Sequence, residues 1–167
     1  MVVIGLPSIL IIGKIKASMV KKVTVTFFGL VCYNLFMNFS EILKPGLVAE
    51  KHATVTDANT AASFGSGAIA VYATPAMIAL MESAALSAVD ALPQGWSTVG
   101  TELNVKHLSA TPVGMKVHAR AELLGIDGRA LSFKVEAFDE AGKIGEGTHG
   151  RFIIEVEKFL AKTEKKR

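Results

Sequence analysis

The sequence has a single cysteine, Cys32, among its 167 residues. One cysteine cannot form a disulfide within the chain, and it cannot supply the several thiolates of a cysteine metal site. No two of the four histidines have the spacing of metal ligands, so we expect no bound metal. A chain without disulfides fits a reducing compartment, and we expect the protein in the cytoplasm.

Acidic residues are absent from the first 36 positions, which hold four lysines. This segment makes the chain basic, because residues 37–167 contain 14 basic and 15 acidic residues, a net charge of −1. A nucleic-acid-binding domain needs clustered lysine and arginine on its folded part. The one such cluster, Lys162 to Arg167, is typical of a solvated chain end, so we expect no nucleic-acid partner.

Long hydrophobic runs are also lacking. Two apolar stretches, residues 1–13 and 23–39, both fall short of the roughly 20 apolar residues that span a bilayer. Three interpretations of residues 1–36 stay open: a membrane anchor, a poorly cleaved signal sequence, or upstream sequence included by too early a start codon. We favour the last, because Met37 opens a polar stretch that leads to a turn at Pro45-Gly46.

We therefore divide the chain into an apolar N-terminal extension, residues 1–36, and one domain, residues 37–167. Membrane contact, and with it a membrane-anchored location, is expected only if the extension is translated.

The domain contains one clear helical pattern. Apolar residues recur at helical spacing from Met77 to Val89, which predicts a helix from Thr74 to about Asp90. Thr74 suits the N-cap and Pro75 the first helical position. Residues 56–67, rich in small and polar side chains, predict a loop in which Phe64 is the one large apolar residue.

The hydrophobic period is two in four segments that follow the helix. Alternating residues predict strands around 99–105, 117–123, 131–137 and 152–156, and residues 47–55 predict a strand before the helix. Short turns, such as Asp127-Gly128, join the later strands and make neighbours antiparallel. One helix cannot cover such a sheet from both sides, so we expect an α+β domain with a curved antiparallel sheet wrapped around one long central helix.

Two residues stand out as candidates for chemistry. Glu82 is the only charged residue between Asn59 and Val89, and a carboxylate on such an apolar helix needs a partner or its pKa rises. The structural alternative is a narrow exposed stripe on the helix. His107 lies near the end of a predicted strand and could act as a general base, although a lone histidine is more often structural.

Thr74 gains interest from its position at the predicted helix N-terminus. Backbone N–H groups and a partial positive charge collect there, which suits a carbonyl oxygen that gains negative charge. The sequence has no nucleophile elbow and no phosphate-binding glycine loop that follows a strand. We expect the remaining histidines to be structural.

The order of elements resembles the hotdog fold, and specific segments resemble the fluoroacetyl-CoA thioesterase-like family. These are Tyr72–Glu82, with a threonine eight residues before the glutamate, then Val99-Gly-Thr101, then Val105–Gly114, and then Gly145–Arg151. The resemblance implies a hotdog thioesterase with Thr74, Glu82 and His107 as the catalytic set. It places Gly100 in the substrate site, implies a homodimer with sites at the subunit interface, and implies no cofactor beyond the coenzyme A of the substrate.

Fluoroacetyl specificity does not follow from the resemblance. In that family phenylalanines ahead of the threonine close the site, whereas here only Phe64 stands in a stretch of small residues, as the candidate substrate contact. We therefore expect a thioesterase for a small acyl-CoA or acyl-carrier substrate. The alternatives are a hotdog acyl-CoA hydratase and a non-catalytic acyl-CoA-binding domain. Candidate cations for the CoA phosphates are Arg120, Arg129, Lys134 and Arg151.

Overall fold

The computed structural model describes residues 20–27 and 30–167, and the chain forms two units, Met1–Asn38 and Phe39–Arg167. In the first unit, β1 (Val20–Phe27) and β2 (Leu30–Met37) pair antiparallel. The apolar run over residues 1–13 lies outside the described residues, so the interpretations of the N-terminal extension stay predictions. Among the described residues, no helix is long and apolar enough to cross a membrane.

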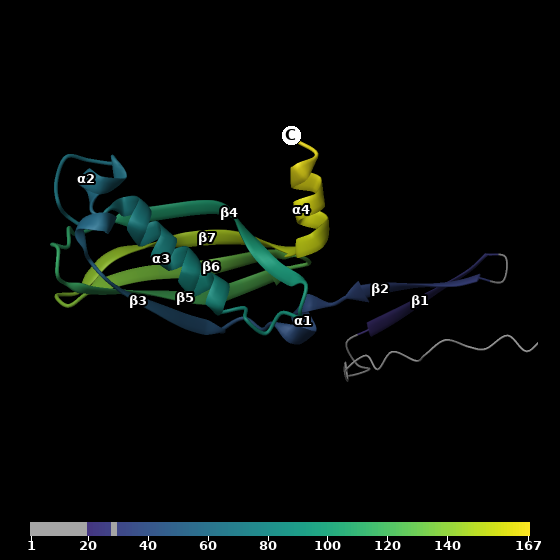
Figure 1. The fold of residues 1–167 in the computed structure, drawn as a ribbon. Coiled ribbons are helices and arrows are strands. Elements are labelled where there is room, and N and C mark those ends of the chain that lie inside the picture. Colours follow the sequence, from purple (N-terminus) through teal and green to yellow (C-terminus); the bar gives the residue numbers. More distant parts are fainter. Residues whose placement is uncertain (1–19, 28–29) are drawn as a thin grey trace, which may run out of the picture. The chain divides into compact units, whose positions relative to one another are not determined.

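The second unit is built on a five-stranded antiparallel sheet with the order β3-β5-β6-β7-β4. Its strands are β3 (Val48–Thr54), β4 (Trp96–His107), β5 (Lys116–Asp127), β6 (Ala130–Asp139) and β7 (Lys143–Glu155). The long helix α3 (Thr74–Ser87) packs across one face of this sheet (Figure 1). The predicted α+β architecture, with one long helix on an antiparallel sheet, is confirmed.

The shorter helices lie at the ends of this framework. They are α1 (Phe39–Ile42), the 3₁₀ helix η2 (Asp57–Asn59), α2 (Ala61–Phe64) and the C-terminal α4 (Val156–Glu164). The segment predicted as a loop over residues 56–67 therefore contains two single-turn helices.

The core lies between α3 and the inner face of the sheet. Alternate residues of β5 and β6 are buried there, as the period of two predicts: Val117, Ala119, Ala121, Leu123, Leu131, Phe133, Val135 and Ala137. Met77 and Met81 of α3 are fully buried against them. A Cβ at Gly145 of β7 would lie 2.6 Å from the Met77 sulfur, so a glycine is required for the helix to approach this closely.

The prediction for the last strand has the wrong parity. Ile153 is fully buried and Phe152 is exposed, whereas the sequence pattern pairs Phe152 with Ile154 and Val156. The inner face of β7 carries two polar residues, His149 and Arg151, which hide the alternation from a hydrophobicity pattern. Val156 begins α4 and does not continue the strand.

Candidate active site

The start of α3 is fixed by backbone hydrogen bonds to two distant segments. The Tyr72 N–H donates to the Thr111 carbonyl at 2.8 Å, and the Ala73 N–H donates to the Asn59 carbonyl at 3.0 Å. The N-cap residue is Ala73, and Thr74 is already the first residue of the helix. The prediction that Thr74 caps the helix is therefore wrong by one position, and its hydroxyl is free for another partner.

That partner is His107, at the end of β4. The Thr74 Oγ1 lies 2.8 Å from His107 Nδ1, a hydrogen bond that joins residues 33 positions apart in the sequence. The other ring nitrogen, Nε2, is sealed from solvent and has no hydrogen-bond partner in the described part of the chain. Because buried polar atoms are nearly always hydrogen-bonded, this nitrogen is an exception that calls for an explanation.

A cavity of about 330 Å³ adjoins this pair. Its walls come from the α2 region, the start of α3 and the turn after β4. The lining residues are Ala61, Ser66, Val71, Tyr72, Thr74, His107, Leu108, Ser109 and Ala110. Most of its lining side chains are small or hydroxylated, so it suits a partly polar group.

Glu82 lies in a second polar cluster, farther along α3. Its side chain is 37% exposed, and its Oε1 lies 3.8 Å from His149 Nε2 and 4.0 Å from an Arg151 Nη1. The carboxylate has the cationic partner that the sequence predicts it to need. Gly100 of β4 makes room for it, because a Cβ at that position would lie 2.6 Å from Glu82 Oε1.

Arg151 is a buried cation, 6% exposed, which the protein holds with several hydrogen bonds. Its guanidinium donates to the Thr98 hydroxyl at 2.8 Å, to the Thr98 carbonyl at 2.9 Å and to His149 Nε2 at 3.0 Å. Burial lowers the pKa of Arg151, whereas the charge of Glu82 raises it. The orientation of this guanidinium fixes a positive charge beside Glu82.

His149 is held neutral in a defined tautomer. Its Nδ1 lies 2.8 Å from the Glu102 carbonyl, which can only accept, so Nδ1 carries the proton and Nε2 accepts from Arg151. Burial, and then the neighbouring Arg151 charge, lower the pKa of His149, although the Glu102 hydrogen bond opposes them. The sequence predicts a structural role for His149 and names Arg151 as a candidate for phosphate contact. In the structure both side chains lie next to the Glu82 carboxylate. Their spacing of two on one strand is the signal that could have paired them.

The Thr74–His107 pair and the Glu82 cluster are separate within this chain. Eight residues of α3 separate Thr74 from Glu82, which is about 12 Å along a helix axis. Gly100, which lies beside Glu82, and His107 are likewise separated along β4. A single thioester-sized group therefore cannot contact both clusters in the isolated protomer.

Phe64 lies on α2 with its side chain 51% exposed, and it is not among the residues that line the cavity. The neighbouring Ala61 and Ser66 line the cavity instead.

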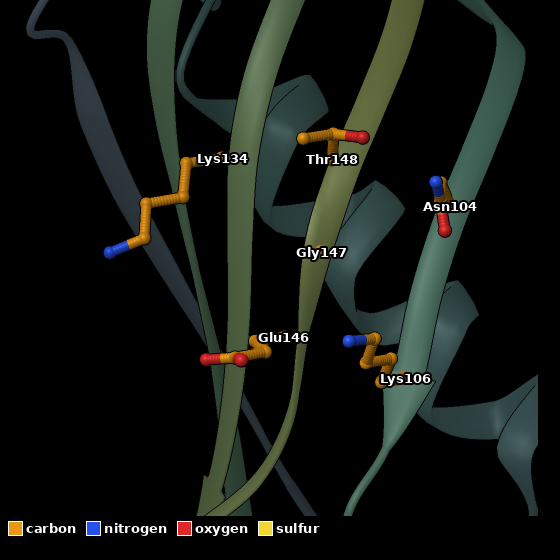
Figure 2. A pocket seen from close by; sticks show the side chains of 6 residues that line it. All are labelled: Asn104, Lys106, Lys134, Glu146, Gly147 and Thr148. Carbon is orange, nitrogen blue, oxygen red and sulfur yellow. The ribbon is translucent and has the colours of Figure 1, made fainter.

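A larger cavity, of about 440 Å³, lies on the face of the sheet opposite α3. Figure 2 shows its lining residues on three strands, with the helix behind them. Lys134 there pairs with Glu136 at 3.0 Å, and Glu146 pairs with Lys143 at 2.9 Å. Such ion pairs are typical of a solvated sheet face, and the cavity gathers none of the candidate catalytic residues.

The four cations named for the CoA phosphates each have a partner within the protomer. Arg120 pairs with Glu122 at 3.1 Å, Lys134 pairs with Glu136, and Arg129 lies over the Trp96 ring at 4.9 Å. Arg151 is buried beside Glu82. The structure therefore singles out none of them for phosphate contact.

Comparison with known proteins gives a consistent result. Residues 55–157 match the sequence model of a family described as fluoroacetyl-CoA-specific thioesterase. The fluoroacetyl-CoA thioesterase of Streptantibioticus cattleyicolor is 44% identical over 97 residues, which cover 58% of this chain and 70% of that protein. A solved structure of the fluoroacetyl-CoA thioesterase is 35% identical, with a TM-score of 0.70 over 75% of this chain and 98% of that chain.

The fold has a wider distribution than this family. A hot-dog-like protein from Thermanaerovibrio acidaminovorans superimposes with a TM-score of 0.71 over 78% of this chain and 97% of that chain, at 21% identity. At that identity the likeness concerns the fold alone, and the predicted hotdog fold is confirmed.

Proposed function

The chain belongs to the family of fluoroacetyl-CoA-specific thioesterases and hydrolyses acyl-CoA thioesters, and from this premise we propose that Thr74, His107 and Glu82 carry out its reaction. The observation that supports the proposal most is the contact of 2.8 Å between Thr74 Oγ1 and His107 Nδ1, with Nε2 buried and unpartnered beside a small cavity.

In this proposal His107 Nδ1–H donates to the Thr74 hydroxyl oxygen, which leaves the Nε2 lone pair as the base. Nε2 takes a proton from water as the water oxygen attacks the thioester carbonyl carbon. The Thr74 hydroxyl hydrogen and the first N–H groups of α3 stabilise the charge that develops on the carbonyl oxygen. The carbon–sulfur bond then breaks, and the CoA thiolate leaves with the proton that His107 accepted.

Glu82 orients the attacking water and stabilises the protonated imidazole. Arg151, held by Thr98 and His149, keeps the carboxylate aligned. Since Glu82 is about 12 Å along the helix from Thr74, this role requires the Glu82 of one protomer to meet the Thr74–His107 pair of another. Each active site is therefore composite.

We propose a homodimer that pairs through β4. This strand is 12 residues long and lies at the edge of the sheet, and residues 100–104 on it are all exposed. A long unprotected edge strand is a template for pairing with another strand. Antiparallel pairing of two β4 strands about a two-fold axis would bring the Gly100 region of one protomer towards the His107 end of the other.

The proposed activity is tested by following free thiol release from short acyl-CoAs with the full-length protein. We expect release from acetyl-CoA and its close homologues, at a rate that a chelator leaves unchanged, because the proposed mechanism uses only side chains and water and needs no cofactor. Disappearance of an enoyl-CoA chromophore without thiol release would instead indicate a hydratase. Binding of the same acyl-CoAs by a folded protein without turnover would indicate a binding domain.

The substitution Gly100→Ala tests the position of Glu82. The new Cβ would lie 2.6 Å from Glu82 Oε1 and 3.2 Å from a carbon of the His149 ring, so the carboxylate must move. A displacement of about 1 Å at a catalytic group can lower kcat by about 10²-fold, and we expect a loss of that order in thiol release.

The control for Gly100→Ala is the same substitution in a Glu82→Ala background. There it should cause little further loss, since the carboxylate that it displaces is absent. Equal losses in both backgrounds would show that Gly100 acts on something other than Glu82.

We further propose that the protein works in the cytoplasm, where acyl-CoA thioesters are available. Fractionation of cells that express the full chain tests this location, and the intact mass of the purified protein tests whether residues 1–36 are retained. Recovery in the membrane fraction with the full mass would support the membrane-anchor interpretation.

A further inference from the structure

Tyr72 lies in the wall of the cavity beside Thr74 and His107, but the proposed mechanism gives it no role. Its side chain is 2% exposed. The backbone around it is fixed, because the Tyr72 N–H bonds to the Thr111 carbonyl and the next N–H bonds to Asn59. The ring is therefore a rigid part of the cavity wall.

The Tyr72 hydroxyl has no hydrogen-bond partner within the part of the chain that the structure describes. Buried tyrosine hydroxyls ordinarily find one. The only side-chain polar atom of the described residues that is both sealed and unpartnered is His107 Nε2, so the Tyr72 oxygen keeps some contact with open space. Tyr72 thus adds a hydroxyl without a protein partner to the wall of a cavity that His107 also lines.

The hydroxyl is a hydrogen-bond donor throughout the neutral range. Burial raises the pKa of Tyr72 to about 12, so the phenol stays protonated and uncharged. A neutral phenol that is itself largely buried is suited to an oxygen acceptor on a ligand. Thr74 and the N–H groups at the start of α3 already supply donors for the thioester carbonyl, which leaves the acyl substituent for Tyr72.

We propose that Tyr72 determines specificity by donating a hydrogen bond from its hydroxyl to an oxygen on the acyl chain, so that short oxygenated acyl-CoAs are the preferred substrates. The cavity of about 330 Å³ has room for a short oxygenated acyl chain, and Ala61, Ser66 and Ala110 keep bulky side chains out of its walls. This inference rests on the proposed thioesterase function and names the substrate class of that same site.

The test compares two acyl-CoAs of nearly equal size, glycolyl-CoA and propionyl-CoA, in which a hydroxyl of the first replaces a methyl of the second. Propionyl-CoA offers the buried Tyr72 hydroxyl no acceptor, and a donor left unpaired in this way disfavours the apolar substrate. We expect the wild-type protein to favour glycolyl-CoA in kcat/KM by at least about tenfold. Tyr72→Phe, which removes one oxygen atom, should bring that ratio close to one by loss of glycolyl-CoA turnover, with propionyl-CoA turnover kept.

The possible outcomes separate this inference from the proposed function. Thiol release from both substrates with the same ratio in wild type and Tyr72→Phe would overturn the role of Tyr72 and leave the thioesterase intact. That result would also be expected if a group of a second protomer satisfied the hydroxyl. If the variant did not fold, a wild-type ratio near one would overturn the inference by itself. No release from glycolyl-CoA, propionyl-CoA or acetyl-CoA would reject both proposals.

Discussion

Replacing His107 by alanine is expected to lower kcat for thioester hydrolysis by about 10²–10⁴-fold, the usual contribution of a general base. Among the described side chains that line the cavity, the His107 imidazole is the only one that can act as a general base near neutral pH. Its loss also removes the hydrogen-bond partner of Thr74, so the hydroxyl is no longer oriented towards the carbonyl. Thiol release from acetyl-CoA under saturating conditions measures the effect.

His52→Ala is the matched control for this substitution. His52 lies on β3 at the other edge of the sheet, and its side chain is 72% exposed. It lies 3.9 Å from a Glu50 carboxylate oxygen, and its ring stacks on that of His118. Surface substitutions of this kind change stability little, and its kcat should equal that of the wild type. Thermal unfolding of both variants would show that the His107 effect is not a loss of fold. A wild-type kcat in His107→Ala would remove this residue from the mechanism.

The sequence predicts the framework better than it predicts the contacts of individual side chains. The alternation at Leu131, Phe133, Val135 and Ala137 predicts β6 and its buried face because hydrophobic burial acts on one face of the sheet at a time. The same rule fails for β7, because it assigns apolar residues such as Phe152 to the buried face, and the structure exposes Phe152. His149 and Arg151 occupy inner positions, and only a buried polar network makes polar residues stable there.

At the site, the contacts of Glu82 and Thr74 were also not predictable from local sequence patterns. The isolation of one carboxylate in an apolar helix predicts a partner for Glu82, and Arg151 lies 4.0 Å from its Oε1, although the Glu82 side chain is 37% exposed. The identity of that partner depends on the pairing of β4 with β7, which is shifted by a bulge between Gly100 and Glu102. Local sequence assigns the Thr74 hydroxyl to capping, whereas a strand 33 residues later provides the contact that it makes. Contacts across the sheet depend on register, which local patterns do not specify.

The proposed composite active site leads to a prediction about mixtures of inactive subunits. Glu82→Ala and His107→Ala homodimers should each be almost inactive. A mixed dimer would contain one site with both residues intact and one site that lacks both. Random pairing makes about half of the dimers mixed, so the mixture should recover about a quarter of the wild-type rate per protein. Co-expression with two different tags, followed by purification of the mixed dimer, should raise this to about half.

A second mixture provides the control. Thr74 and His107 are hydrogen-bonded within one protomer, so His107→Ala combined with Thr74→Val leaves every site with one defective member of the pair. No activity should return in that mixture, although the subunits exchange equally well. If Glu82→Ala and His107→Ala also failed to complement each other in a purified mixed dimer, all three residues would have to act within one protomer. Complementation in the first mixture alone would therefore locate the catalytic residues and establish the dimer in the same measurement.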